Sequence, residues 1–192
     1  MLPKARSFIQ NKGFTLIELM VTIAIVAILA MLAAPSLRDL MVKNEFASVG
    51  NEFNGSIMRA RNEAVSRNSC VTMCMSSNVQ DANPQCSTAD NNWQAGWVVY
   101  LNPSCSATNP DTTKPEETIL ARKPAGSDYL LQSQANEHAF TFTPQGRPTA
   151  LGLRQFNLAF KSADDPMTTK YGSNICMDGL GKTWSVKAGN NC

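Results

Sequence analysis

The chain has 192 residues, of which 43% are hydrophobic, a formal net charge of +2 and six cysteines. This length suits one globular domain with an additional membrane segment. The near balance of 17 basic and 15 acidic residues gives no bulk case for a nucleic-acid-binding or acidic-membrane-binding surface.

The N-terminal part of the chain consists of a short basic leader and a long apolar stretch. The leader, residues 1–13, contains basic residues and no acidic one. The stretch that follows, residues 14–34, would be about 31 Å long as an α-helix, enough to cross the hydrocarbon core of a bilayer once. Because basic flanks stay on the cytoplasmic side, we expect the leader inside and the chain from Arg38 onward outside.

Glu18 is the one charged residue of the apolar stretch. A carboxylate inside a membrane helix costs roughly 3 kcal/mol on insertion scales, so such a residue indicates a function. No basic residue of the stretch can pair with it. An ordinary secretory signal is the weaker alternative, because it would avoid this charge and would show an Ala-x-Ala cleavage site. We therefore expect the partner of Glu18 on another chain.

The residues around Glu18 carry a family resemblance. The sequence Lys12-Gly13-Phe14-Thr15-Leu16-Ile17-Glu18 resembles the class III signal of type IV pilins and type II secretion pseudopilins, and Pro35 matches a proline of that family's helix. The resemblance implies cleavage after Gly13 by a prepilin peptidase, which then methylates the new N-terminus at Phe14. It also implies that Glu18 meets the N-terminal amine of a neighbouring subunit during assembly. Without its leader, the mature chain would have a formal charge of −1.

Helical periodicity continues beyond the membrane stretch. Pro35 lacks an N–H and should kink or loosen the helix locally. Apolar residues then recur at steps of three and four, which predicts one amphipathic stripe opposite a polar face. The stripe is formed by Phe46, Val49, Phe53, Ile57, Ala60 and Ala64. We predict one long helix with a membrane half, residues 14–35, and an amphipathic half, residues 36–68.

The remaining residues, 69–192, predict a β-rich domain outside the membrane. Polar residues and prolines predict loops at 76–92 and 102–117 and a turn at 144–147. The last two strands are expected to form a hairpin over residues 178–181. Expected strands are residues 70–75, 96–101, 118–122, 129–132, 139–143, 156–161, 174–177 and 182–187.

All six cysteines lie beyond the membrane stretch. An even number in an exported domain predicts three disulfides, for which fifteen pairings are possible. We expect Cys74–Cys86 to close the polar loop after the first strand, and Cys176–Cys192 to tie the last segment to its hairpin. Cys70–Cys105 then follows by elimination. Neither this spacing nor the single histidine, His138, suits a zinc site, so we expect no metal and no cofactor.

Later blocks narrow the resemblance to the FimT/FimU/GspH group of minor pilins and minor pseudopilins. The group implies an α+β, pilin-like fold, with a long N-terminal helix packed on two antiparallel β-sheets. It also implies a minor subunit that helps initiate assembly and lies near the tip of a type IV pilus or secretion pseudopilus. The implied partners are other minor and major pilins or pseudopilins and an inner-membrane assembly platform. The blocks are Arg59–Ala64, Trp93, Gly96–Tyr100, Phe142–Arg147 and Gly181-Lys182.

A second class of function, a pilus-borne DNA receptor, is known among FimT-like proteins. The resemblance points there to a Gly-Arg-x-Arg run, which reads Gly181-Lys182-Thr183-Trp184 in this chain. Lys182 keeps one basic position, whereas Trp184 is expected to pack on the sheet. Lys187, the other candidate contact, lies on the opposite face of the strand. We therefore expect weak, salt-dependent DNA binding or none.

Catalysis is not expected, because no nucleophile with a base and no pair of acids in a cleft is apparent. For the other residues that could suggest a binding site, we expect a purely structural role. We expect Trp97 and Tyr100 in the core or on a sheet face, and His138 in a surface loop. A solvated helix face is expected to carry Arg59, Arg61 and Arg67.

Overall fold

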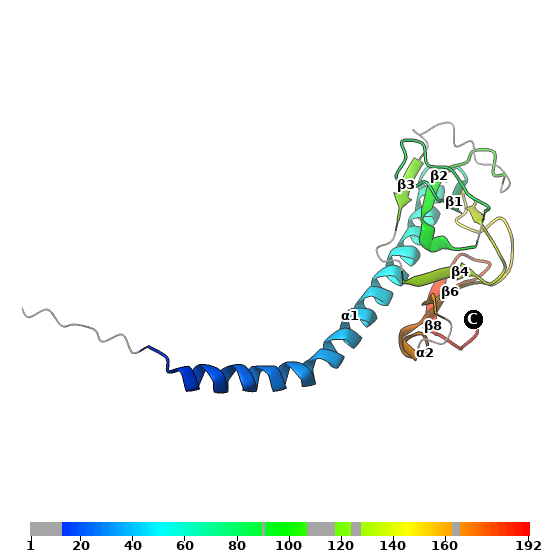
Figure 1. The fold of residues 1–192 in the computed structure, drawn as a ribbon. Coiled ribbons are helices and arrows are strands. Elements are labelled where there is room, and N and C mark those ends of the chain that lie inside the picture. Colours follow the sequence, from blue (N-terminus) through cyan, green and yellow to red (C-terminus); the bar gives the residue numbers. More distant parts are fainter. Residues whose placement is uncertain (1–12, 90, 107–117, 124–127, 163–165) are drawn as a thin grey trace, which may run out of the picture. The chain divides into compact units, whose positions relative to one another are not determined.

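The computed structural model describes residues 13–89, 91–106, 118–123, 128–162 and 166–192. The leader up to Lys12 and residues 107–117 of the expected insertion lie outside this part of the chain. The chain divides into two compact units, one ending at Met41 and the other formed by Val42–Cys192. Helix α1, Leu16–Ser66, contributes to both units (Figure 1).

Helix α1 confirms the predicted periodicity. Its helical assignment continues through Pro35, and its buried residues are the six of the predicted stripe together with Ser56. Ser56 is tolerated there because its hydroxyl donates to the Glu52 carbonyl at 2.8 Å within the same helix. At the C-terminal end, Asn68 has a left-handed φ of 47° and the Ser69 N–H donates to the Ala64 carbonyl. This αL cap explains why the helix ends there.

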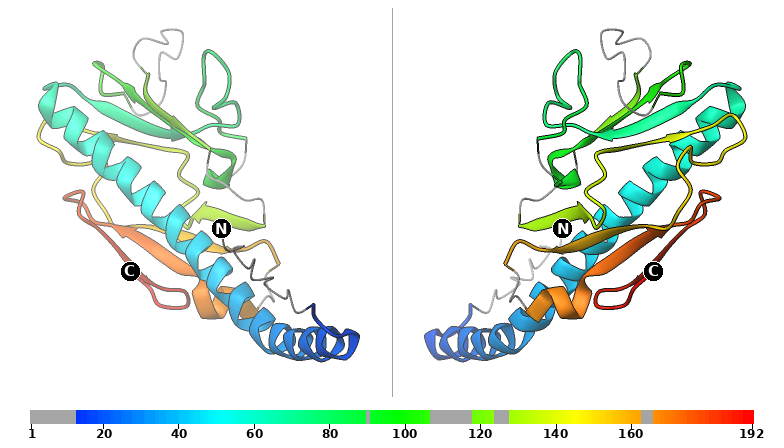
Figure 2. Two further views of the ribbon diagram at one scale, coloured as in Figure 1. Left: turned by 90° about the vertical axis from the view of Figure 1, so that its left-hand side faces the viewer. Right: turned by 90° about the vertical axis from the view of Figure 1, so that its right-hand side faces the viewer.

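Two four-stranded antiparallel sheets follow (Figure 2). The first has the order β3-β2-β1-β5, and the second has the order β4-β6-β7-β8. Their strands are β1 Val71–Met75, β2 Trp97–Leu101, β3 Thr118–Arg122, β4 Tyr129–Ser133, β5 Ala139–Phe142, β6 Arg154–Phe160, β7 Ser173–Met177 and β8 Thr183–Lys187.

All eight predicted strands are present, with small differences at their ends. Strand β6 begins two residues earlier than predicted, at Arg154. Two short helices were not predicted: the 3-10 turn η1, Trp93–Ala95, and the helix α2, Pro166–Tyr171. Each is too short to show helical periodicity. Their local signals are the Asn92 side chain, which accepts from the Gln94 N–H, and Pro166 at the first helical position.

One core joins the second half of α1 to both sheets. Phe53 on α1 is fully buried, and its ring lies 5.2 Å from Trp97 of the first sheet and 4.9 Å from Phe156 of the second. Trp93 adds a third edge-on contact at 5.4 Å. The predicted burial of Trp97 and Tyr100 is confirmed, since they are 0% and 3% exposed. The amphipathic half of α1 is therefore the central element of the globular unit.

Three disulfides tie the loops to the strands. The structure pairs Cys74 with Cys86, Cys176 with Cys192, and Cys70 with Cys105, which are the three pairs expected from the sequence. Cys70, Cys74 and Cys176 are buried next to or within strands. Their partners lie in irregular segments: Cys86 after β1, Cys105 after β2 and Cys192 after β8. Each bridge therefore anchors an irregular segment to a sheet.

Candidate functional site

The residues predicted for processing and for the assembly contact, Gly13, Phe14 and Glu18, lie at the beginning of α1. Gly13 and Phe14 precede the helix, and the Phe14 side chain is 85% exposed. Thr15 accepts a hydrogen bond from the Glu18 backbone N–H at 3.2 Å, and Glu18 lies in the first helical turn. Sequence reasoning missed this role of Thr15, although the Thr-x-x-Glu pattern of a capping box was present. The cap uses the backbone of Glu18 and leaves its carboxylate available.

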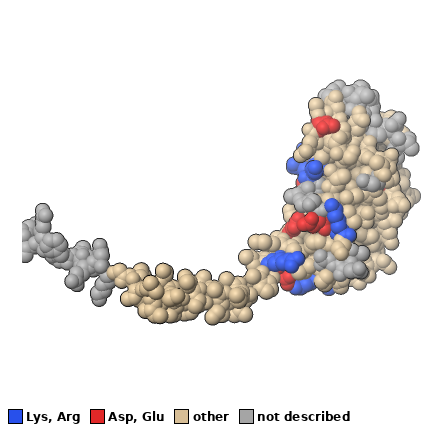
Figure 3. Space-filling view, viewed as in Figure 1, with Lys and Arg blue, Asp and Glu red and all other residues tan. Residues whose placement is uncertain are grey.

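Glu18 begins the exposed apolar half of α1. No charged residue occurs between Glu18 and Arg38, and the large apolar side chains of this half are at least half exposed. Within the described residues, α1 is the helix that is long and apolar enough to cross a membrane. Figure 3 shows no charged side chain on the visible face of this stretch. Such a surface requires lipid or other helices to cover it.

The few hydroxyls of the apolar half are satisfied inside the helix. Thr22 donates to the Leu19 carbonyl at 2.8 Å, and Ser36 donates to the Ala33 carbonyl at the same distance. These bonds remove the cost of placing a hydroxyl in hydrocarbon. The Glu18 carboxylate, in contrast, forms no ion pair with any residue that the structure describes. In the described part of the apolar half, Glu18 is therefore the charged side chain without an ion-pair partner.

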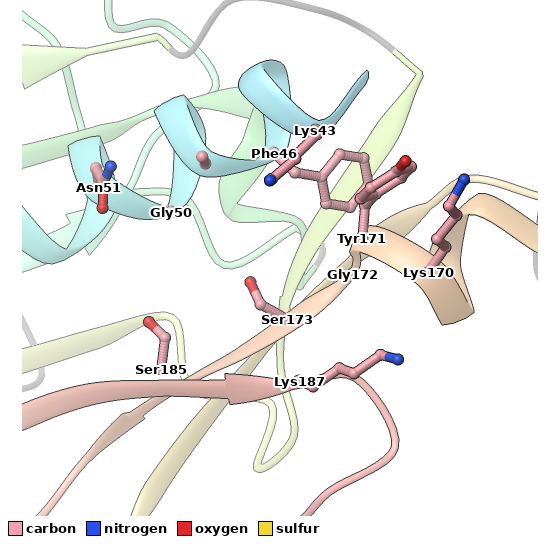
Figure 4. A pocket seen from close by; sticks show the side chains of 11 residues that line it. Lys43, Phe46, Gly50, Asn51, Lys170, Tyr171, Gly172, Ser173, Ser185 and Lys187 are labelled. Carbon is pink, nitrogen blue, oxygen red and sulfur yellow. The ribbon is translucent and has the colours of Figure 1, made fainter. Parts of the chain in front are cut away.

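The two candidate DNA contacts do not come together. Lys182 lies in the turn before β8 and Lys187 is the last residue of that strand, and both are exposed. The Lys182 backbone closes the turn, because its N–H donates to Asp178 and its carbonyl accepts from the Asp178 N–H. Trp184 is half-buried and lies opposite Cys176 in the hairpin. Lys187 instead lines a hollow with Lys43 and Lys170, a grouping that the sequence did not indicate (Figure 4).

Of the three arginines expected on a solvated helix face, Arg59 and Arg67 confirm the prediction and Arg61 does not. Arg59 and Arg67 are exposed and flank Glu63, with Nε to carboxylate distances of 3.8 and 2.7 Å. Arg61 does not lie on a solvated face, as the sequence suggested, but is half-buried and donates from Nε to the Gly146 carbonyl at 2.9 Å. Its partner belongs to a turn distant in sequence, which explains why helical periodicity alone could not find it.

Gly146 explains the Phe-x-Pro-x-Gly-Arg block that contributed to the resemblance. It has a left-handed φ of 72°, and a Cβ there would lie 3.0 Å from the Val65 side chain on α1. Its N–H donates to the Thr143 carbonyl at 2.8 Å and closes the turn. Glycine is therefore required both by the turn and by the close approach of the helix.

His138 lies in the loop between β4 and β5, as expected, where it is half-buried and its carbonyl accepts from the Met75 N–H. The residues that the structure describes contain no group of three or more His, Cys, Asp or Glu side chains placed to hold a metal ion.

Comparison with known proteins decides the family. The family model "Type II transport protein GspH" matches residues 49–181, more than half of the chain. The chain belongs to the GspH family. The model of the prokaryotic N-terminal methylation motif matches residues 10–34, which include Gly13, Phe14 and Glu18. No curated protein matches the chain.

Solved structures show the same fold. Two crystal forms of the type IV minor pilin FimU of Pseudomonas aeruginosa (strain PAO1) match this GspH-family chain. One has 18% identity and a TM-score of 0.54, and covers 73% of this chain and 87% of FimU. The other has 17% identity and a TM-score of 0.51, with coverages of 73% and 91%. The fold is pilin-like, and the GspH-family chain is a structural, pilus-related subunit.

Proposed function

We propose that this chain is a minor pilin-like subunit that helps initiate assembly of a type IV pilus or type II secretion pseudopilus and lies near its tip. The observation that carries the proposal is the Glu18 carboxylate at the head of an exposed apolar helix, which has no ion-pair partner among the residues that the structure describes. A charge in hydrocarbon is stable only with a partner, and an isolated subunit offers none in its apolar half. The fibre supplies the partner as the N-terminal amine of a neighbouring subunit.

Processing precedes assembly. A prepilin peptidase cleaves after Gly13 and methylates Phe14, which places the new amine four residues before Glu18. The basic leader stays cytoplasmic, α1 crosses the inner membrane, and the β-rich unit lies in the periplasm until the assembly platform moves the subunit into the fibre. N-terminal mass spectrometry tests this step. Methylated Phe14 is the expected terminus, and an intact Met1 in the mature protein would contradict it.

Glu18→Ala tests the assembly step. This substitution preserves the Thr15 cap, because the cap uses the backbone N–H of residue 18. The variant should be inserted and cleaved normally, while its amount in sheared fibres falls about tenfold or more, the effect of losing a charge contact worth over 1.4 kcal/mol. Thr22→Ala is the matched control, because the Thr22 hydroxyl bonds only within its own helix. Equal recovery of the Glu18 and Thr22 variants from fibres would contradict the assembly role.

The place in the fibre has its own test. Deletion of the gene should lower the number of fibres or the secretion that depends on them, and a tagged copy should label one fibre end in electron micrographs. Labelling along the whole fibre would instead indicate a major subunit.

A further inference from the structure

A basic hollow lies between the second half of α1 and the β8 edge of the second sheet. We name it the lysine groove, after Lys43 on α1, Lys170 on α2 and Lys187 on β8 (Figure 4). Its volume is about 340 Å³, and no acidic side chain lines it. Gly50, Ser173 and Ser185 form part of its wall.

Two of the three groove lysines present positive charge that no described residue neutralises. Lys43 and Lys187 are exposed and have no ion-pair partner among the residues the structure describes. The Lys170 ammonium lies 5.0 Å from the centre of the Tyr171 ring. At Gly50, a Cβ would touch only the Leu158 side chain, at 3.9 Å, so the groove is open there. Ammonium and hydroxyl donors around an open hollow suit carboxylate ligands.

Carboxylates occur on the opposite flank of the same helix. Glu45 and Glu52 are seven residues apart, so they share one flank of α1, and 100° per residue places both about opposite Lys43. The ring of Phe46 on this helix lies 5.8 Å from that of Tyr129 on β4, and the pKa of Tyr129 is raised by burial and, to a smaller degree, by the charges of Glu45 and Glu52. Glu52 is also 3.6 Å from Arg122, whereas Glu45 has no ion-pair partner in the described part of the chain.

The sheet order separates these two charged surfaces. The lysine groove lies at β8, an edge strand of the second sheet, whereas Glu52 on the other flank of α1 pairs with Arg122 of β3, an edge strand of the first sheet. Two complementary but different surfaces on one fold suit a head-to-tail contact, the type that builds open helical filaments. An isologous contact would instead bring each surface against its own copy and place like charges together.

We propose that the lysine groove binds the carboxylate-bearing flank of α1 of the adjacent pilin-family subunit. The inference rests on the proposed function, since it requires that the chain enters a fibre. In this chain that flank carries Glu45 and Glu52, so the partner of the groove is a subunit with carboxylates at the corresponding positions of its own α1. The contact fixes the orientation of the globular units around the bundle of apolar helices, a role for which electrostatic complementarity is suited.

Zero-length carbodiimide cross-linking of sheared fibres tests the contact, because it joins an ammonium directly to a carboxylate. Mass spectrometry should find Lys43 or Lys187 linked to Glu or Asp on α1 of another pilin-family subunit. Lys43→Glu together with Lys187→Glu should lower the amount of the chain recovered in sheared fibres about tenfold, as expected for a contact worth roughly 1.4 kcal/mol. Lys182→Glu, a substitution of an exposed lysine outside the groove, is the matched control and should leave that amount unchanged.

The design separates the two proposals. Absence of the wild-type chain from fibres refutes the proposed function, whereas its presence there without links from the groove lysines refutes the contact alone. Restored incorporation of the Lys43/Lys187 variant by a carboxylate-to-lysine substitution in the cross-linked neighbour would support the contact directly.

A duplex DNA gel shift with the full chain in detergent tests the competing hypothesis, that the lysine groove binds nucleic acid. If the wild-type chain retards the DNA, and the Lys43/Lys187 variant does not while Lys182→Glu still does, the proposal is overturned and the groove is a nucleic-acid site.

Discussion

Arg154, the first residue of β6, donates from Nε to Oε1 of Glu137 across 2.9 Å. The Arg154 side chain is 6% exposed, and its Nη2 also donates to the Ala150 carbonyl at 3.1 Å. Glu137 precedes β5 in the first sheet, and its carbonyl accepts from the indole of Trp93. The ion pair therefore links the second sheet to the segment that enters the first sheet.

Glu137→Ala should lower the free energy of unfolding by about 2–4 kcal/mol, because it leaves the Arg154 guanidinium buried without its charged partner. Glu137→Gln keeps an acceptor at the same place and should cost less. Urea unfolding of the Val42–Cys192 unit, with its disulfides intact, measures both changes. Equal stability of the alanine variant and the unsubstituted unit would show that the pair contributes nothing.

Phe53→Ala should lower the free energy of unfolding by about 3–5 kcal/mol, because its ring fills the space where α1 meets both sheets. Near-ultraviolet circular dichroism should also lose signal, since Trp93 and Trp97 are packed against this ring. Met58→Ala on the same helix is the control, because Met58 is 53% exposed. A similar loss for both variants would contradict the central role of Phe53.

Replacing Cys176 and Cys192 together by alanine should lower the free energy of unfolding by about 2–4 kcal/mol and free the C-terminal segment from β7. Peptide mapping without reduction should find Cys176–Cys192, Cys74–Cys86 and Cys70–Cys105 in the exported protein. A limited protease digestion should release the C-terminal residues only from the double variant. Free thiols or another pairing in the exported protein would refute the assigned connectivity.

Burial raises the pKa of the Tyr100 phenol to about 12, an effect that the Thr72 hydroxyl partly offsets. In the unfolded chain the phenol ionises near pH 10, so between about pH 10 and 12 the folded state holds the proton that the unfolded state loses. Stability is therefore complete below pH 10 and falls as the pH rises toward 12, by roughly 2 kcal/mol. Urea unfolding at pH 9 and 11.5 measures the fall. Tyr100→Phe should show a smaller fall, and an identical one would exclude Tyr100 as its source.

The sequence alone determined the features that depend on neighbouring residues. The length of the apolar stretch, the position of Glu18 after Gly13 and the stripe on α1 are local patterns, and period and composition are enough to interpret them. The strands were predicted for the same reason, since alternation and turn residues mark their ends. Thr15, η1 and α2 were missed, although each has a local capping or proline signal.

Only the tertiary structure decided which distant residues meet. Arg61 was assigned to solvent because its helix neighbours are polar, yet the turn around Gly146 brings a carbonyl to within 2.9 Å of its guanidinium. Strand alternation separates Lys187 from Lys182, but only the packing of α1 and α2 against the β8 edge places Lys187 with Lys43 and Lys170. Helix and strand periods fix the face on which a side chain lies, but the packing of α1 across both sheets fixes what that face contacts.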